Sequence, residues 1–174
     1  FNFMDGTDGI ASVQAISMLL AAAGIAAWAA PGVTAEPVWI WILCLAGASC
    51  GFLAHNWPPA RIFLGDVGSM YLGFMLFVCA VLTIQRGWLS YASWLILAAS
   101  FASDATLTLA RRMLRGDRFF EAHRSHAYQR LARRWHSHKR VALLVLAINS
   151  LLLAPLALAA AAFPDYEWAI VALA

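Results

Sequence analysis

Five long apolar runs dominate this sequence and constrain what it can fold into. They occupy residues 10–30, 38–53, 69–84, 88–109 and 141–163, and a shorter run begins at Trp168. About 20 helical residues cross the hydrocarbon core of a bilayer, and somewhat fewer suffice where neighbours shield the helix ends. Because the runs are continuously apolar rather than alternating, helices are favoured over barrel strands. We therefore expect an all-α, polytopic transmembrane helix bundle with about five spans and a partial sixth.

The composition excludes an ordinary soluble protein. Hydrophobic residues make up 63% of the chain and charged residues 12%, and the mean hydropathy is +0.72, a balance that a soluble domain could not hide from water. We expect a lipid bilayer as the main partner, and no nucleic acid. Residues 1–174 are interpreted as a single membrane domain of a longer protein, truncated at both ends.

The distribution of cations predicts which side of the membrane each loop faces. Ten of the twelve Lys and Arg residues lie between Arg111 and Arg140, so the positive-inside rule places the loop 111–140 in the cytoplasm. Counting spans back from it places loops 1–9 and 55–68 on the same side. The predicted location is the inner (cytoplasmic) membrane of a bacterium, as a multi-pass protein whose active site faces the cytoplasm.

The first of these loops carries two acids, Asp5 and Asp8, each followed by a glycine, directly before an apolar run. Glycine allows tight turns and a close approach of the backbone to a ligand, and the following helix start adds partial positive charge. A pair of helix-capping acids is the alternative. The loop alone does not decide between a ligand site and a cap.

The second loop places Asp66 between Gly65 and Gly68, again immediately before an apolar run. Three carboxylates, from Asp5, Asp8 and Asp66, would repel one another unless a cation lay between them. A hard divalent ion such as Mg²⁺, which prefers carboxylate, water and phosphate oxygens, is the natural neutraliser. Phe63 in the same loop is either a packing residue or a ring that stacks on a base.

The third loop contains most of the cations, which favour attraction to anionic lipid headgroups, and the sequence His123-Arg124-Ser125-His126. On a helix the two histidines would share a face and could approach one anionic group. A zinc pair is disfavoured because no further Cys or His lies at ligand spacing. Asp104, in the fourth apolar run, is expected to pair with Arg111 or Arg112, because an unpaired carboxylate within a span is costly.

Taken together, the three loops resemble the polyprenyl-phosphate N-acetylhexosamine-1-phosphate transferase family. The matching stretches are residues 2–11, Asn56 with 63–69, and 123–126, in the family's order and with its placement between spans. The resemblance implies transfer of a sugar-1-phosphate from a UDP-N-acetyl sugar to polyprenyl (undecaprenyl) phosphate, with release of UMP. It also implies Mg²⁺ as cofactor, with Mn²⁺ as a substitute, and allows a homodimer.

The resemblance assigns roles to individual positions. Asp66 is similar to the family's acid that binds the metal, and Asp5 to the acid beside the metal and phosphates. His123 and His126 are similar to the family's catalytic histidine motif. The substrate-binding positions implied in the same way, with Phe63 stacking on uracil, are Asn2, Gly6, Thr7, Asp8, Asn56, Phe63, Gly65 and Arg124.

The third loop and the residues after Asp104 resemble the O-antigen-initiating branch more than the muramyl-pentapeptide branch. The family's tandem-aspartate motif belongs upstream of Phe1, so we expect this chain alone to be inactive. One alternative is a non-catalytic or ion-coupled membrane carrier that uses the loop acids. Another is a CDP-alcohol phosphatidyltransferase, which is disfavoured because residues 12–28 contain no charge.

Overall fold

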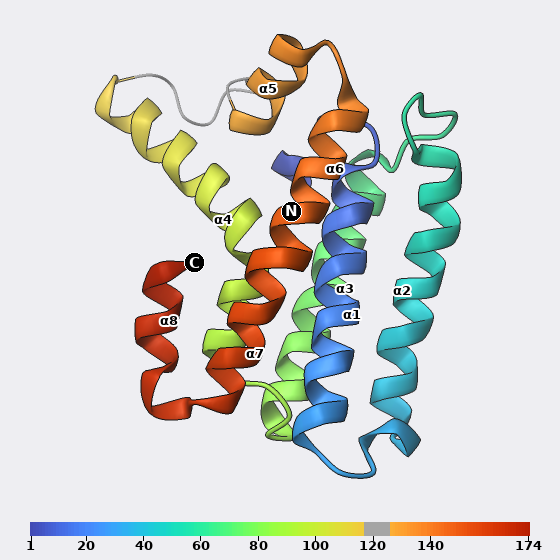
Figure 1. The fold of residues 1–174 in the computed structure, drawn as a ribbon. Coiled ribbons are helices and arrows are strands. Elements are labelled where there is room, and N and C mark those ends of the chain that lie inside the picture. Colours follow the sequence, from blue (N-terminus) through green and yellow to red (C-terminus); the bar gives the residue numbers. More distant parts are fainter. Residues whose placement is uncertain (117–125) are drawn as a thin grey trace.

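The computed structural model describes residues 1–116 and 126–174, which form helices joined by short turns (Figure 1). The long helices are α1 (Ile10–Ala29), α2 (Pro37–Asn56), α3 (Gly65–Gln85), α4 (Tyr91–Leu114) and a continuous helical stretch made of α6 (His138–Ile148), η3 (Asn149–Leu153) and α7 (Ala154–Ala162). The short ones are η1 (Asn2–Met4), η2 (Val33–Ala35), α5 (Ala127–Trp135), η4 (Pro164–Tyr166) and α8 (Glu167–Leu173). Within the described residues there is no strand.

Five of these helices are long and apolar enough to cross a membrane, which confirms the predicted all-α bundle. The expected loop boundaries need correction. The loop 55–68 is shorter than predicted, because α2 continues through Asn56 and α3 already begins at Gly65. The seven residues of α8 extend only about 10 Å, too short to cross the hydrocarbon core.

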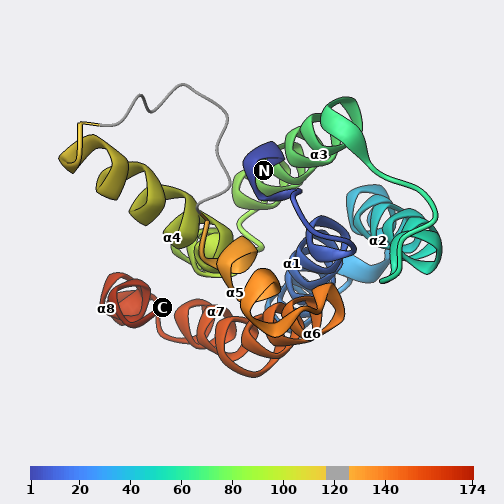
Figure 2. The ribbon, with the colours of Figure 1, turned by 90° about the horizontal axis from the view of Figure 1, so that it is seen from above.

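Helix α1 lies at the centre of the bundle, with α2, α3 and the α6–α7 stretch around it (Figure 2). Its many alanines let neighbouring backbones approach closely, as is common where membrane helices pack. The indole nitrogen of Trp39 in α2 also donates to the Ala23 carbonyl at 2.9 Å. The outer helices leave large apolar side chains exposed, among them Phe74 and Phe77 of α3, as expected for surfaces that face lipid.

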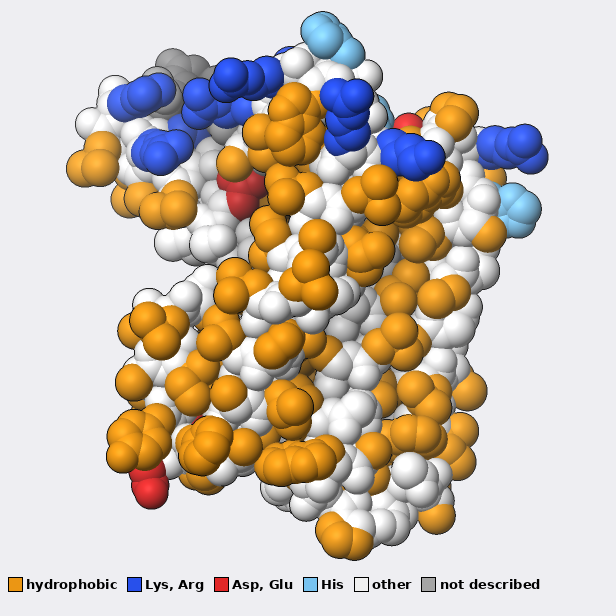
Figure 3. Space-filling model, in the orientation of Figure 1, with side chains coloured by type: hydrophobic (Ala, Val, Ile, Leu, Met, Phe, Trp, Pro, Cys, Tyr) orange, Lys and Arg blue, Asp and Glu red, His pale blue; other side chains and the backbone are white. Residues whose placement is uncertain are grey.

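Lys and Arg side chains gather at one end of the molecule, over α5 and the neighbouring ends of α4 and α6 (Figure 3). The start of α1, the end of α2 and the start of α3 lie at the same end (Figure 1). The three loops expected to share one side of the membrane are therefore together. That this end faces the cytoplasm stays a prediction.

A buried polar cluster ties α1 to α4 and to the π-helical turn η3. The Gln14 side-chain oxygen accepts from Ser100 Oγ at 2.8 Å and from Asn149 Nδ2 at 2.7 Å. The Gln14 amide nitrogen donates to the Leu97 carbonyl at 3.1 Å. Gln14 and Asn149 are buried, and their hydrogen bonds offset the cost of removing amides from water.

Candidate active site

A polar pocket of ≈ 270 Å³ lies among the loops at the cation-rich end of the bundle. Its lining residues are Asn2, Asp5, Gly6, Thr7, Asp8, Asn56, Phe63, Leu64, Gly65 and Asp66. All of them except Leu64 are positions that the sequence nominated as catalytic or substrate-binding. The structure thus brings together two loops separated by two membrane-spanning helices.

Two glycines with positive φ lie at the N-terminal ends of the helices beside this pocket. Gly9 (φ 76°) is the N-cap of α1, and Gly65 (φ 67°) is the first residue of α3. A side chain is strained in this region of φ, so glycine is favoured. The N-cap of α1 is Gly9, and among the described residues no backbone nitrogen at the start of α1 donates to Asp5 or Asp8, which disfavours the interpretation of these two as capping acids.

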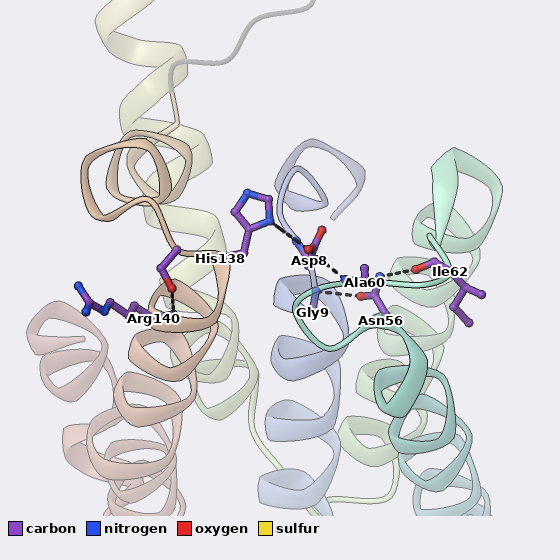
Figure 4. A network of polar contacts seen from close by, with 8 residues as sticks. Asp8, Gly9, Asn56, Ala60, Ile62, His138 and Arg140 are labelled. Carbon is purple, nitrogen blue, oxygen red and sulfur yellow. Dashed lines mark hydrogen bonds and ion pairs between the residues drawn. The ribbon is translucent and has the colours of Figure 1, made fainter.

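The two asparagines of the pocket hold its walls in place. The Asn56 oxygen accepts from the Gly9 backbone nitrogen at 2.8 Å, and its amide nitrogen donates to the Ile62 carbonyl at 2.8 Å (Figure 4). The Asn2 oxygen accepts from the hydroxyl of Ser69 in α3. Both ends of the Asn56 amide are therefore engaged by backbone, which gives this residue a scaffolding role in addition to its place in the pocket wall.

Asp8 makes contacts that the sequence did not predict. Its Oδ2 accepts from the Ala60 backbone nitrogen at 3.3 Å and lies 3.2 Å from Nδ1 of His138, at the start of α6 (Figure 4). The same Nδ1 lies 3.4 Å from the Asp8 backbone nitrogen. It can accept from that N–H when neutral or donate to the carboxylate when protonated, but not both. No spacing rule relates residues 8 and 138, so only the fold reveals the pair.

The carboxylates of Asp5 and Asp66 are in a different situation. Among the described residues, neither accepts a hydrogen bond or forms an ion pair. Burial raises the pKa of Asp5 to about 6, and the negative charge of Asp66 adds to the shift. Asp66 lies in the first turn of α3, where the partial positive charge of the helix end favours an anion. These two acids line the same pocket, and among the described residues neither has an ion-pair partner.

Such a pair fits a hard divalent cation. In residues 1–116 and 126–174 no three metal-ligating side chains converge, so the chain does not build a closed metal cage there. Two carboxylates with open positions suit Mg²⁺, which usually keeps several waters and shares its coordination with phosphate oxygens. We had expected three carboxylates to share the ion, but Asp8 is engaged by Ala60 and His138.

Two other pocket residues have groups open to a ligand. The Thr7 hydroxyl is buried without a hydrogen-bond partner among the described residues, an arrangement that costs free energy unless a bound molecule pairs with it. The Phe63 ring is 74% exposed, too exposed to be the packing residue considered above. Its face is free for stacking, as a base-binding role would need.

Of the histidine motif, the structure places only His126, which does not line this pocket. His123 and Arg124 lie outside the described residues, so their predicted roles, and the face expected to be shared by the two histidines, stay predictions. His126 is the N-cap of α5 and precedes its first helical residue. It is buried, with Nδ1 3.7 Å from Asp104 Oδ1. The contact between His126 and Asp104 is an ion pair when the imidazole is protonated, and the expected pairing of Asp104 with Arg111 or Arg112 stays a prediction.

A model of glycosyl transferase family 4 matches residues 1–84, which include every residue of the pocket wall. The chain is also 32% identical over 163 residues to decaprenyl-phosphate N-acetylglucosaminephosphotransferase of Mycobacterium tuberculosis (strain CDC 1551 / Oshkosh), a match that covers 83% of the chain. The first 84 residues of the chain thus match glycosyl transferase family 4, and the similarity to the mycobacterial relative extends over most of the chain. The predicted family resemblance is therefore confirmed.

The chain has a second kind of relative. It is 44% identical over 86 residues, 47% of its length, to phospho-N-acetylmuramoyl-pentapeptide-transferase of Chlamydia trachomatis (serovar L2, strain ATCC VR-902B / DSM 19102 / 434/Bu). The chain spans 40% of the mycobacterial relative and 24% of the chlamydial one. No solved structure matches it.

Proposed function

We propose that the protein containing this chain transfers a sugar-1-phosphate from a UDP-N-acetylhexosamine to polyprenyl phosphate, undecaprenyl phosphate in the favoured case, and releases UMP. One observation carries the proposal: Asp5 and Asp66, from two distant loops, line one pocket whose residues match glycosyl transferase family 4, and among the described residues neither carboxylate has an ion-pair partner. The names of both relatives describe transferases of phosphorylated N-acetyl sugars. The match to this family favours this reaction over an ion-coupled carrier and over a CDP-alcohol phosphatidyltransferase.

The pocket residues supply binding and orientation for this reaction. An oxygen of the lipid phosphate forms a bond to the sugar-bearing phosphorus, while the bond from that phosphorus to the UMP oxygen breaks and its electron pair leaves with UMP. When bound, Mg²⁺ would supply positive charge that offsets the repulsion between the two anionic reactants. Asp66 and Asp5 would hold it, with Mn²⁺ as a substitute.

The donor nucleotide would lie along the remaining wall of the pocket. The exposed Phe63 ring would stack on uracil, and the unpaired Thr7 hydroxyl, with the Gly6 and Asp8 backbone, would contact the ring edge. The nearby membrane surface supplies the lipid acceptor. We propose the bacterial inner membrane as the location, the cytoplasm as the side of the pocket and O-antigen initiation as the pathway.

The experiment is an assay of Mg²⁺-dependent UMP release by the full-length protein. It receives undecaprenyl phosphate and a panel of UDP-N-acetyl sugars, with parallel reactions that lack the lipid or contain EDTA. We expect release with one or more donors, and only when both lipid and metal are present. Absence of release with every donor, from protein shown to be folded, would overturn the proposal.

A further inference from the structure

The carboxylate of Asp104, in α4, holds the start of α5. Its Oδ1 accepts from the Ala127 backbone nitrogen at 2.8 Å, and its Oδ2 lies 3.3 Å from the donating Tyr128 backbone nitrogen. The first N–H groups of a helix have no partner within the helix, and a negative charge there is favourable. Asp104 therefore acts as a cap supplied by a different helix.

The His126 side chain contacts both Asp104 and Tyr128. Its Nδ1 lies 3.7 Å from Asp104 Oδ1, and its ring stacks on that of Tyr128 at 5.7 Å between centroids. The side chains of His126 and Asp104 are only 5% and 11% exposed. The position of Tyr128 is thus fixed from two directions, through its backbone nitrogen and through the face of its ring.

Tyr128 in turn contacts the loop that carries Asp5. The Tyr128 phenol is hydrogen-bonded to the Gly6 backbone, and a Cβ at Gly6 would collide with the Tyr128 hydroxyl and with the Gln129 amide. Burial raises the pKa of Tyr128 to about 12, and the Gly6 hydrogen bond opposes part of this rise. A continuous series of contacts therefore runs from Asp104 through α5 to the Asp5–Gly6 turn.

We propose that Asp104 and Tyr128 are positioning residues for the transfer reaction: through α5 they hold the Asp5–Gly6 turn, and with it the Asp5 carboxylate, in place. Their role in turnover rests on the function proposed above, whereas the series of contacts from Asp104 through α5 to the Asp5–Gly6 turn does not depend on it. Neither residue lines the pocket. Small displacements of a group that orients reactants can cost about 10²-fold in rate, so a contact outside the pocket can affect turnover.

Hydrogen exchange of the full-length protein tests the link without any substrate. We expect Asp104→Ala and Tyr128→Phe each to speed amide exchange in residues 4–9 by about 10-fold, because the loop loses the contact that keeps it closed. Thr108→Val is the matched control. It removes the hydroxyl that donates to Asp104 Oδ1 at 3.1 Å from within α4 and leaves the contact with α5 intact. Unchanged exchange in Tyr128→Phe would overturn the inference.

Steady-state kinetics then test the role in turnover. Asp104→Ala and Tyr128→Phe should each lower kcat by about 10-fold with less than about a twofold change in KM for the UDP-sugar. Because both act through the same contact, the double variant should be little worse than either alone. Asp104→Asn, which keeps one acceptor oxygen, should recover part of the loss, and Thr108→Val should behave as wild type.

The outcomes separate the two proposals. No UMP release by the wild type would overturn the proposed function, while the exchange result would still decide the link between α5 and the loop. Normal kcat in Tyr128→Phe, or losses that add in the double variant, would overturn the positioning role in an enzyme that is otherwise active. If Asp104→Ala does not fold, Tyr128→Phe alone decides, because it keeps the ring and removes only the hydroxyl.

Discussion

Two polar clusters in this bundle differ in how their groups are paired. In the first, the amides of Gln14 and Asn149 and the Ser100 hydroxyl bond to one another between three helical elements. In the second, Asp5 and Asp66 face one pocket, and among the described residues their carboxylates have neither a hydrogen bond nor an ion pair. Both clusters are built from residues far apart in the sequence.

The difference separates a structural role from a functional one. Buried polar groups cost free energy unless they are paired, so a fully paired cluster is stable as it stands. Asp5 and Asp66, which lack an ion-pair partner among the described residues, leave charge available to a bound cation, as is typical of functional sites. The two clusters are both polar; they differ in whether their polar groups are paired with one another, and this difference separates the candidate site from the Gln14 cluster, which holds helices together.

The substitution Asp66→Asn tests this difference between the two clusters most directly and should have the largest effect. If the unpaired acids serve the reaction, removing this charge should lower UMP release by about 10³-fold or more, because the phosphates lose the stabilisation held at this position. The melting temperature should change little, since the side chain has no partner to lose. Asp165→Asn, which removes an exposed acid in η4, is the control and should keep full activity. Near-normal turnover in Asp66→Asn would show that the metal assignment is wrong.

A second test uses the pKa of Asp5, which burial and then Asp66 raise to about 6 from an ordinary value of 3.8. The folded protein therefore holds the Asp5 proton to higher pH than the unfolded chain. Without divalent metal, folding stability should fall as pH rises from about 4 to about 6, because the folded state binds more protons there. Asp5→Asn should flatten this dependence of the melting temperature and lower turnover by about 10²-fold. Parallel melting curves for wild type and variant would contradict the assignment.

The smallest effect on turnover is expected in the paired cluster. Gln14→Leu leaves the amide of Asn149 and the hydroxyl of Ser100 without this partner and should reduce the free energy of unfolding by about 1–2 kcal/mol. Turnover should stay within about twofold of wild type, because no pocket residue moves. Ser17→Ala is the control, since among the described residues its hydroxyl bonds only to the Val13 carbonyl of the same helix. A loss of turnover in Gln14→Leu as large as in Asp5→Asn would contradict the assignment of a structural role to one cluster and a functional role to the other.

The sequence predicted the helices better than their ends. Continuous apolar runs identify spans because the bilayer requires them, and all five spans begin within four residues of the predicted position. The ends are set by local backbone chemistry that hydropathy does not register. Helix α4 continues to Leu114 because arginines are good helix formers once the chain leaves the membrane.

The candidate pocket was predictable as a set of residues but not as a set of contacts. Acids beside glycines at span starts pointed to Asp5 and Asp66, and the resemblance supplied their neighbours. The ion pair of Asp8 with His138 and the cap that Asp104 provides for α5 depend on the fold. Asp104 was expected to pair along its own helix; Thr108 of that helix does donate to it, but the backbone nitrogens of Ala127 and Tyr128 in α5 are partners that spacing did not indicate. The role of His126 as a substrate contact stays a prediction.

The π-helical turn at Asn149–Leu153 changes the phase of the fifth span. Successive residues of an α-helix are offset by about 100° around its axis, and a π turn accommodates one extra residue without breaking the helix. Val141, before the turn, and Ala157, after it, would point in nearly opposite directions on a regular α-helix, yet both are buried in the bundle. Deleting one residue here would restore a regular helix and rotate α7 relative to α6, so that the buried face of one of them would turn away from the bundle.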